Sequence, residues 1–426
     1  MSANFNRNPT GKNQYAKSEA LEESIKTALQ GYHQDGVTNY AIISQLLFKD
    51  LEVTLGPKQV QRRLSKLGLF AAKGTMERIE HADVVQLVLD ELDKDVVKHL
   101  GVKSIRDKIR QTSDVILSRS FVSWMMHLHD PDGFAGRNPT AKRIYRSPKY
   151  PIGINHKWSS DGHDKLYSIG YPIYAIVDDA TGKTLGAWVL PSNRQQDIIL
   201  YVYLCCVEKY GGIPLTTTTD CGTETLKMVN MQKELRNTFH PDISEAEVPA
   251  HIYLRSVHNI SVERSWYRLR LDFGDRAVYL FKEGAIQGIY NPHDADHVQL
   301  SLWLWSRILQ KELDATVEFR NNSAVRKQKA KPGPSGFSRN IAYTLYEQWG
   351  GVDCKLVVDM NLIREQKALL GGDTLLEFTT LEFSQRAQAV FVTLGEVPLS
   401  MESGWTLFQV MLPDVFPERN FLRPVL

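Results

Sequence analysis

Three acidic residues in this sequence could together hold divalent metal ions: Asp161, Asp220 and Glu263. Asp161 follows a tryptophan and two serines in an extended stretch, Asp220 ends the β-branched run TTTTD, and Glu263 lies in a helical stretch. Carboxylate oxygens suit Mg²⁺, a hard cation that prefers near-octahedral geometry. Two such ions, about 3.5–4 Å apart, stabilise the attacking and leaving oxygens of an in-line phosphodiester displacement. Three acids brought together in this way would suit metal-dependent chemistry on a phosphodiester, but three acids alone are weak evidence for it.

These acids can act together only if elements distant in the sequence converge. From residue 153 onward, extended and helical runs follow in the order three strands, helix, strand, helix, strand, helix. That order predicts α/β layering around a mixed sheet, and sites in open α/β sheets form at strand ends. The chain has 49 Asp and Glu residues, so an isolated acid at a strand end would usually be an ordinary turn residue. The residues around each acid must therefore distinguish a metal ligand from an ordinary turn residue.

The sequences around the acids resemble the successive core motifs of retroviral-type integrases. In order, the motifs are WSSDGHDKL, YAIVDDATG, TDCGTE and NISVERSW. The chain is most similar to the eukaryotic integrase core domain proteins of fungi and animals. The resemblance covers roughly Arg137 to Tyr346, and the helical region upstream is similar to that family as well. Four motifs in the right order make the resemblance specific, although no single motif would do so.

The resemblance implies a fold, an activity and a site. The fold is ribonuclease-H-like, with a mixed five-stranded sheet and helices. The site is a DDE triad in which Asp161, Asp220 and Glu263 are the catalytic and metal-binding residues for two Mg²⁺ or Mn²⁺ ions. The activity is that of a DDE-type integrase or transposase, which cleaves the 3′ end of a mobile element and transfers it to target DNA.

Three positions near the triad are expected to have supporting roles, and a fourth, Glu224, has no role in the site. By the resemblance, Asp178 is a structural turn residue and not a ligand. Gly222 is expected to let the backbone turn sharply after the catalytic strand. Asn259, one helical turn ahead of the glutamate, would orient substrate or cap the helix. Glu224 is expected to face solvent or cap a helix.

The sequence departs from the family pattern at three places. Thr225 stands where the family often has asparagine, and Ser261 stands where an arginine commonly precedes the glutamate. The second change removes a phosphate contact. No His-His-Cys-Cys zinc module precedes the core, unlike in retroviral integrases. All three acids of the triad are present.

Two helix–break–helix patterns precede the core. Pro57 begins a segment whose apolar residues Val60, Leu64 and Leu67 recur at helical spacing. This layout is typical of a helix-turn-helix, in which the second helix enters the major groove of DNA. In the second pattern, Ser118 is a good N-cap for the helix that follows. The basic residues expected to contact DNA are Lys58, Arg62, Arg63 and Lys66 in the first pattern, and Arg137, Lys142, Arg143 and Arg146 in a basic linker after the second.

The distribution of charge is more informative than the net charge of +2. Between Gly101 and Tyr150 there are ten Lys and Arg residues against four Asp and Glu, and Arg320 to Arg339 has six basic residues and no acidic one. Basic segments on a nearly neutral chain fit contact with a polyanion. They are equally compatible with solvated linkers.

Composition limits the class of protein. A chain of 426 residues with 42% hydrophobic and 23% charged residues is expected to fold into roughly two to four globular domains. Its longest apolar run, around Ile198 to Val207, is about half of a membrane span. Four irregularly spaced cysteines predict neither a disulfide framework nor a zinc site. We therefore expect an intracellular protein without membrane contact, and the resemblance implies that it acts in the nucleus.

The domain prediction divides the chain into seven segments. From Phe378 onward, short apolar runs alternate as in strands, which predicts a small β-rich C-terminal domain. The segments are a disordered tail (1–17), a helix-turn-helix unit (18–75), a second helical unit (76–136), a basic linker (137–152), the catalytic core (153–320), a basic loop (321–340) and the C-terminal domain (341–426).

The leading hypothesis is an integrase or transposase that acts on double-stranded DNA as a homo-oligomer. A first alternative is a host-adopted descendant that binds DNA or protein without catalysis. A second is a ribonuclease-H-like nuclease that cuts DNA but does not join it. Retention of all three acids argues only weakly against the first alternative, because a recently silenced copy would also keep them.

Overall fold

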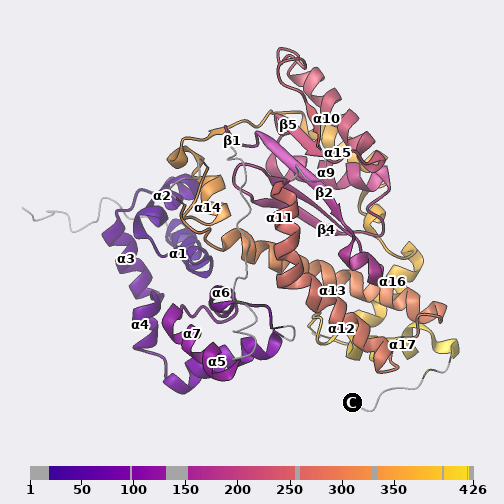
Figure 1. Cartoon of the computed structure of the whole chain (residues 1–426), viewed down its shortest axis with the longest axis horizontal. Coiled ribbons are helices and arrows are strands. Elements are labelled where there is room, and N and C mark those ends of the chain that lie inside the picture. The colour runs from indigo at the N-terminus through magenta and orange to yellow at the C-terminus, as the bar shows by residue number, and fades with distance from the viewer. Residues whose placement is uncertain are drawn as a thin grey trace, which may run out of the picture. The chain divides into compact units, whose positions relative to one another are not determined.

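The computed structural model describes residues 19–95, 98–130, 152–254, 260–328, 333–395, 398–419 and 421 (Figure 1). The chain folds into two compact units. The first unit contains residues 1–91 and 102–130, and the second contains residues 92–101 and 131–426. None of the helices in these described ranges is long and apolar enough to cross a membrane.

The first unit is helical, as predicted. Asn39 Oδ1 accepts from the Ala41 backbone N–H at 2.9 Å and caps α2, and Ser118 Oγ accepts from Phe121 N at 3.2 Å and caps α7 as expected. Capping side chains satisfy backbone donors that the first turn of a helix leaves open. The helices are α1 (Glu19–Gln34), α2 (Tyr40–Leu51), α3 (Pro57–Lys66), α4 (Ala72–Met76), α5 (His81–Lys94), α6 (Val102–Ser113) and α7 (Arg119–His129).

α2 and α3 form a helix-turn-helix pair. Ile43 and Leu47 of α2 and Val60 and Leu64 of α3 are buried. Apolar residues at this spacing place one stripe of each helix against its partner. Val53, in the connection between the helices, is buried as well. The opposite side of α3 remains open to solvent.

The second unit is built on a mixed five-stranded sheet, which confirms the predicted core. The strand order is β4-β3-β2-β5-β6. β2 is antiparallel to β3, β3 is antiparallel to β4, and β2, β5 and β6 run parallel. The strands are β2 (Lys157–His163), β3 (Ile173–Asp178), β4 (Thr184–Val189), β5 (Thr216–Thr219) and β6 (His251–Tyr253). Helices α9 (Gln196–Tyr210) and α10 (Leu226–Phe239) make the connections that parallel pairing requires.

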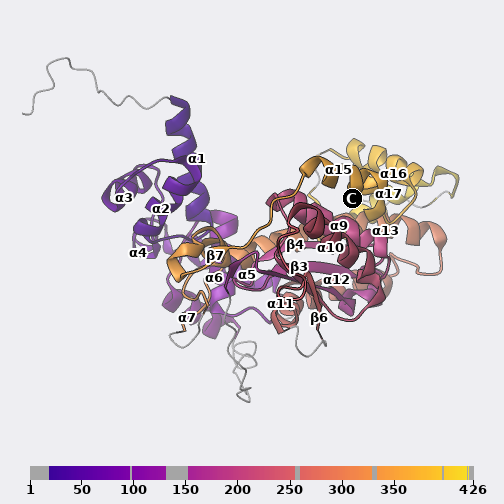
Figure 2. The same ribbon diagram turned by 90° about the horizontal axis from the view of Figure 1, so that it is seen from above.

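Both faces of the sheet are covered by helices (Figure 2). Ala175 and Val177 of β3 belong to one buried cluster, together with residues of the helices after β6. Tyr174 and Ile176 alternate with them and join a second cluster with α9 and α10. The helices of the first cluster include α11 (Ile260–Leu269), the π-helical turn η4 (Arg270–Gly274), α12 (Asp275–Ile286) and α13 (Ala295–Asn322).

The prediction of a β-rich C-terminal domain is wrong, because the described part of this region is helical. Phe383 and Ala387 are buried four residues apart on α16, and Phe408 and Met411 are buried three apart on α17. That spacing belongs to helices, and the short runs were too brief to distinguish it from alternation. The elements are α14 (Arg339–Thr344), β7 (Val352–Asp353), which pairs with β1 (Gly153–Ile154), α15 (Met360–Leu369), α16 (Leu381–Thr393) and α17 (Gly404–Val415).

The C-terminal helices complete the two clusters of the second unit. Ile363 of α15 packs in the cluster with α9 and α10, whereas Phe383 and Phe408 pack with α12 and α13. The C-terminal residues therefore add layers to the core. Short 3-10 turns connect the longer elements: η1 (Asp164–Ile169), η2 (Thr223–Thr225), η5 (Tyr346–Trp349), η6 (Gly372–Leu376) and η7 (Pro417–Arg419).

Candidate metal site at the sheet edge

Two of the predicted ligands lie on neighbouring strands. Ser159 of β2 pairs in register with Thr218 of β5, and their hydroxyls are 2.8 Å apart. Side chains two positions further along a strand return to the same face. Asp161 on β2 and Asp220, the first residue after β5, therefore follow this pair side by side.

The electrostatics at this edge agree with the register. The buried Tyr174 hydroxyl donates to Ser160 Oγ at 3.0 Å. Burial raises the pKa of Tyr174, and the negative charges of Asp161, Glu224 and Asp220 raise it further. Charges act on a pKa only when they are near. The three carboxylates therefore lie around the same end of the sheet.

Glu224 lies closer to the acids than the sequence suggested. It is the middle residue of the short turn η2 and is half-buried. Its carboxylate lies over Gly222, at the place where a Cβ on that residue would stand. The backbone of Gly222 has φ −73° and ψ 142°, a conformation open to any residue. The backbone conformation at position 222 therefore does not itself require glycine, and the missing side chain makes room for the Glu224 carboxylate.

Helix α11 packs on the face of the sheet that carries the two aspartates. The indole N–H of Trp266 donates to Asp161 Oδ2 at 3.0 Å. The backbone of Glu263 belongs to this helix, three residues before Trp266. The side chain of Glu263 and the whole of Asn259 lie outside the described residues.

A chain of hydrogen bonds supports the backbone at Asp220. His251 of β6 contacts Thr217 Oγ1 through Nδ1 at 2.9 Å and Thr219 Oγ1 through Nε2 at 3.3 Å. Because the Thr219 hydroxyl donates to the Asp220 carbonyl at 2.8 Å, Nε2 is the donor to Thr219. Burial lowers the pKa of His251 to about 4, which keeps the ring neutral at physiological pH. Sequence reasoning did not identify this histidine.

Asp178 lies away from the other acids. It pairs with Trp158 across β2 and β3, and Trp158 is three residues before Asp161, or about 10 Å along the strand. The Asp178 carboxylate is fully buried. It accepts from the backbone N–H groups of Asn155 and Thr181, each at 2.9 Å, and from the Thr181 hydroxyl at 2.7 Å. These are the contacts of a residue that holds a turn.

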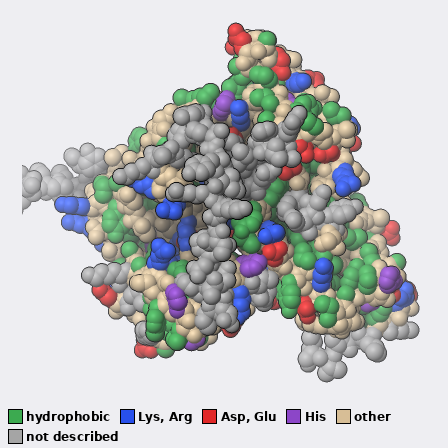
Figure 3. Space-filling view, in the orientation of Figure 1, with side chains coloured by type: hydrophobic (Ala, Val, Ile, Leu, Met, Phe, Trp, Pro, Cys, Tyr) green, Lys and Arg blue, Asp and Glu red, His purple; other side chains and the backbone are tan. Residues whose placement is uncertain are grey.

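The predicted DNA-binding residues of α3 divide into two kinds. Lys58, Arg62 and Lys66 are exposed, and Figure 3 shows Lys and Arg side chains at the surface of this helical unit. Arg63 instead forms a bidentate ion pair with Glu22, at 2.5 and 3.1 Å. This bond raises the pKa of Arg63. The four basic linker residues lie outside the described residues: Arg137, Lys142, Arg143 and Arg146.

The donor chemistry at the sheet edge fits a divalent ion. Asp161 and Asp220 offer oxygen ligands, which Mg²⁺ and Mn²⁺ accept. Within the described ranges, no group of three His, Cys, Asp or Glu side chains is placed to hold a metal. The two aspartates could supply part of a coordination shell, and Glu263 on α11 is the candidate for the third ligand.

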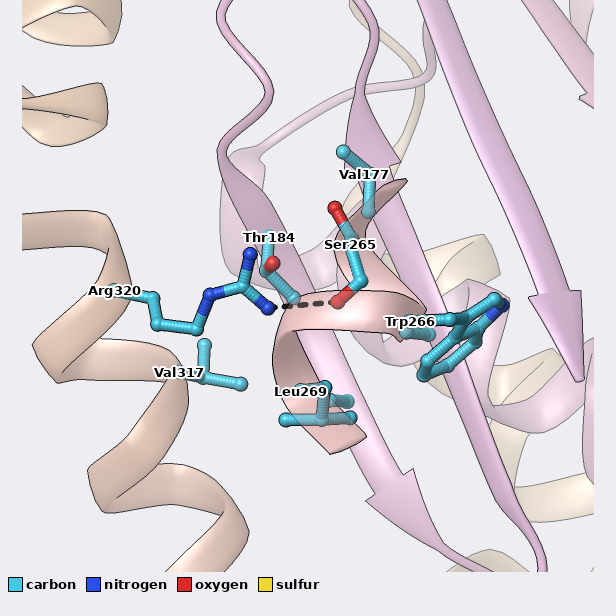
Figure 4. Close-up of a pocket in the computed structure, with 9 residues that line it drawn as sticks. Val177, Thr184, Ser265, Trp266, Leu269, Val317 and Arg320 are labelled. Carbon is cyan, nitrogen blue, oxygen red and sulfur yellow. Dashed lines mark hydrogen bonds between the residues drawn. The ribbon is translucent and has the colours of Figure 1, made fainter. Parts of the chain in front are cut away.

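A small pocket lies between α11, α13 and the sheet (Figure 4). Thr184, Trp266, Val317 and Arg320 are among its lining residues, and its volume is about 10 Å³. One water molecule needs about this much space. The pocket is therefore a packing gap and too small for a substrate.

Residues 147–342 match a family model described as an integrase core domain. No curated protein matches the chain. The matched segment includes β2, β5 and α11, the elements that carry or directly precede the three acids.

Trp266 also lies in the matched segment, and sequence reasoning gave this residue no role. Its position three residues after Glu263 on one helix was the available signal.

Proposed function

We propose, on the premise that residues 147–342 form an integrase core domain, that this chain is a DDE-type polynucleotidyl transferase. It would cleave the 3′ ends of a mobile element and join them to target DNA. Members of this family are typically polynucleotidyl transferases that act on DNA with divalent metals. The parallel register of Ser159 with Thr218 supports the proposal, because it leads β2 and β5 toward Asp161 and Asp220 at the same end of the sheet.

The proposed reaction has two chemically similar steps. In the first, water attacks a phosphodiester and releases a 3′-hydroxyl end. In the second, that hydroxyl attacks a phosphodiester of target DNA, and another 3′-hydroxyl leaves. Each step breaks one P–O bond and forms one, so no oxidant or further reactant is needed. A single site can therefore serve both.

Asp161, Asp220 and Glu263 would hold the metal ions. When bound, a pair of ions supplies a Lewis acid for the phosphate and lowers the pKa of the attacking hydroxyl. The carboxylates contribute the negative charge that offsets repulsion between two divalent cations. The His251 and Thr219 hydrogen bonds keep the backbone of Asp220 fixed.

DNA binding would rest on phosphate contacts. Lys58, Arg62 and Lys66 are exposed on α3, the second helix of a helix-turn-helix pair. We do not propose a DNA contact for Arg63, because its guanidinium group pairs with Glu22. We also propose that the chain acts as a homo-oligomer, because both ends of an element must be bound. We propose that it acts in the nucleus, because the target is chromosomal DNA.

Glu263→Gln tests the proposal. The substitution keeps the size of the side chain but removes its charge, so cleavage and joining should fall together by about 100- to 1,000-fold. The assay uses an end-labelled duplex as donor, a supercoiled plasmid as target, and Mg²⁺ or Mn²⁺. Glu365→Gln on α15, at an exposed position, is the matched control and should retain activity.

The same assay separates the alternatives. Joined product from the wild-type chain supports an integrase or transposase. Cut product without joining indicates a nuclease, and retention of labelled DNA without either product indicates a silent binding protein. If Glu263→Gln keeps full activity, the assignment of the third ligand is wrong.

A further inference from the structure

Trp266 connects the strand of one predicted ligand with the helix of another. Its indole N–H spans from α11 to Asp161 Oδ2 on β2, a distance of 3.0 Å. Trp266 is only 7% exposed and belongs to the cluster that covers this face of the sheet. Glu263 and Trp266 are three residues apart, and such positions lie on one side of a helix. A shift or rotation of α11 would therefore pull the donor away from Asp161.

The opposite side of α11 is held by α13. Arg320 Nη1 donates to the backbone carbonyl of Ser265 at 2.8 Å, and its Nε lies 3.9 Å from Asp272 of η4. Figure 4 shows Arg320 reaching the turn of α11 while Trp266 points away from it. The helix is thus fixed from two directions. Trp266 is the contact on the side of the acids.

Fixing one oxygen of a carboxylate sets the direction of the other. Carboxylates that bind metals are themselves commonly hydrogen-bonded, and loss of such a partner typically weakens metal binding about 10- to 100-fold. An indole N–H can only donate, so it suits an ionised carboxylate and cannot compete for the metal. The buried ring has little freedom to turn, and its orientation is therefore already set.

We propose that Trp266 is a positioning residue, which orients Asp161 for metal binding and couples that carboxylate to the helix carrying Glu263. This inference rests on the proposed function, because it takes Asp161 as a metal ligand. It assigns no contact between Trp266 and DNA or metal. Its effect should appear in the affinity for the ion, with or without a nucleic acid substrate.

Mn²⁺ binding to the full-length chain, measured by calorimetry without DNA, tests the inference. Trp266→Phe removes the donor and should weaken Mn²⁺ binding by about 10- to 100-fold. Trp303→Phe is the matched control, because the Trp303 indole also lies buried in the same cluster and donates to Ser384 Oγ at 3.2 Å. Both variants should lower the Tm of the metal-free chain, but only Trp266→Phe should lose affinity.

Trp266→Leu is a second variant, an apolar side chain of different shape that also lacks a hydrogen-bond donor. It keeps the test decisive if Trp266→Phe does not fold. Wild-type affinity in a folded Trp266 variant, or an equal loss in Trp303→Phe, would overturn the inference while leaving the proposed function intact. Failure of the wild-type chain to bind Mn²⁺ and to cut DNA would overturn both.

Discussion

Two aspartates in neighbouring strands have opposite environments. Asp178 is fully buried among three donors, and burial raises its pKa to about 6. Asp161 is partly exposed at the edge of the sheet, beside the indole of Trp266. A metal ligand must be reached by an ion and its waters, whereas a turn residue needs only fixed donors. The exposure of the carboxylate therefore distinguishes a candidate metal ligand from a turn residue, although both residues are aspartates.

Asp178→Asn should destabilise the protein without affecting metal binding. An amide presents one oxygen, so it cannot accept both from Asn155 and from the two donors of Thr181. We expect the free energy of unfolding to fall by about 2 kcal/mol, measured by urea denaturation. Asp242→Asn, at an exposed position, should leave it unchanged. Loss of Mn²⁺ affinity in a folded Asp178→Asn variant would show that this carboxylate belongs to the metal site.

At the scale of elements, Arg320 of α13 contacts both α11 and the π-helical turn that follows it. In η4 the Asp275 backbone N–H bonds to the carbonyl of Arg270, five residues back, and such turns commonly occur at functional sites. Asp272 of this turn and Ser265 of α11 both contact Arg320. One side chain of α13 thus holds the helix and the turn that ends it. The position of α11 over the sheet depends on this contact as well as on Trp266.

Arg320→Met should destabilise the protein strongly. The substitution leaves the mostly buried Asp272 carboxylate without the Arg320 charge, and loss of one partner from a buried ion pair costs about 3–5 kcal/mol. The double variant Arg320→Met with Asp272→Leu should recover part of this loss, because the Asp272 charge is removed together with that of Arg320. Urea denaturation of the four proteins in this cycle measures the coupling energy. Strictly additive effects would mean that the two residues do not interact.

At the scale of the whole molecule, local motifs were sufficient for the core but not for the C-terminal region. The mixed five-stranded sheet with its helices follows from the order of strands and helices together with the family motifs, whereas the order of the strands within the sheet was not predicted. The sequence predicts strands over the runs that lead into α16 and α17, because apolar runs of only about 4–8 residues do not separate helical from strand periodicity. Neither the Glu22–Arg63 pair nor the approach of Glu224 could be predicted, since both depend on packing between separate segments.

The exposed basic residues of α3 should determine the salt dependence of DNA binding. Each phosphate contact that is lost lowers the slope of log K against log salt by about 0.9. Replacing Lys58, Arg62 and Lys66 with alanine in the full-length chain should therefore reduce the slope by up to about 2.7. Fluorescence anisotropy with a labelled duplex, repeated over a range of salt concentrations, measures it.

Two controls decide whether the effect belongs to α3. Alanine at Lys282, Lys311 and Arg386, exposed residues of the second unit, removes the same net charge and should leave the slope nearly unchanged. Arg63→Ala should change the slope little, because Glu22 already pairs with that guanidinium. An equal fall in slope for both triple variants would indicate that net charge alone attracts the DNA. The helix-turn-helix would then be a structural unit, and the DNA contacts would have to lie elsewhere in the chain.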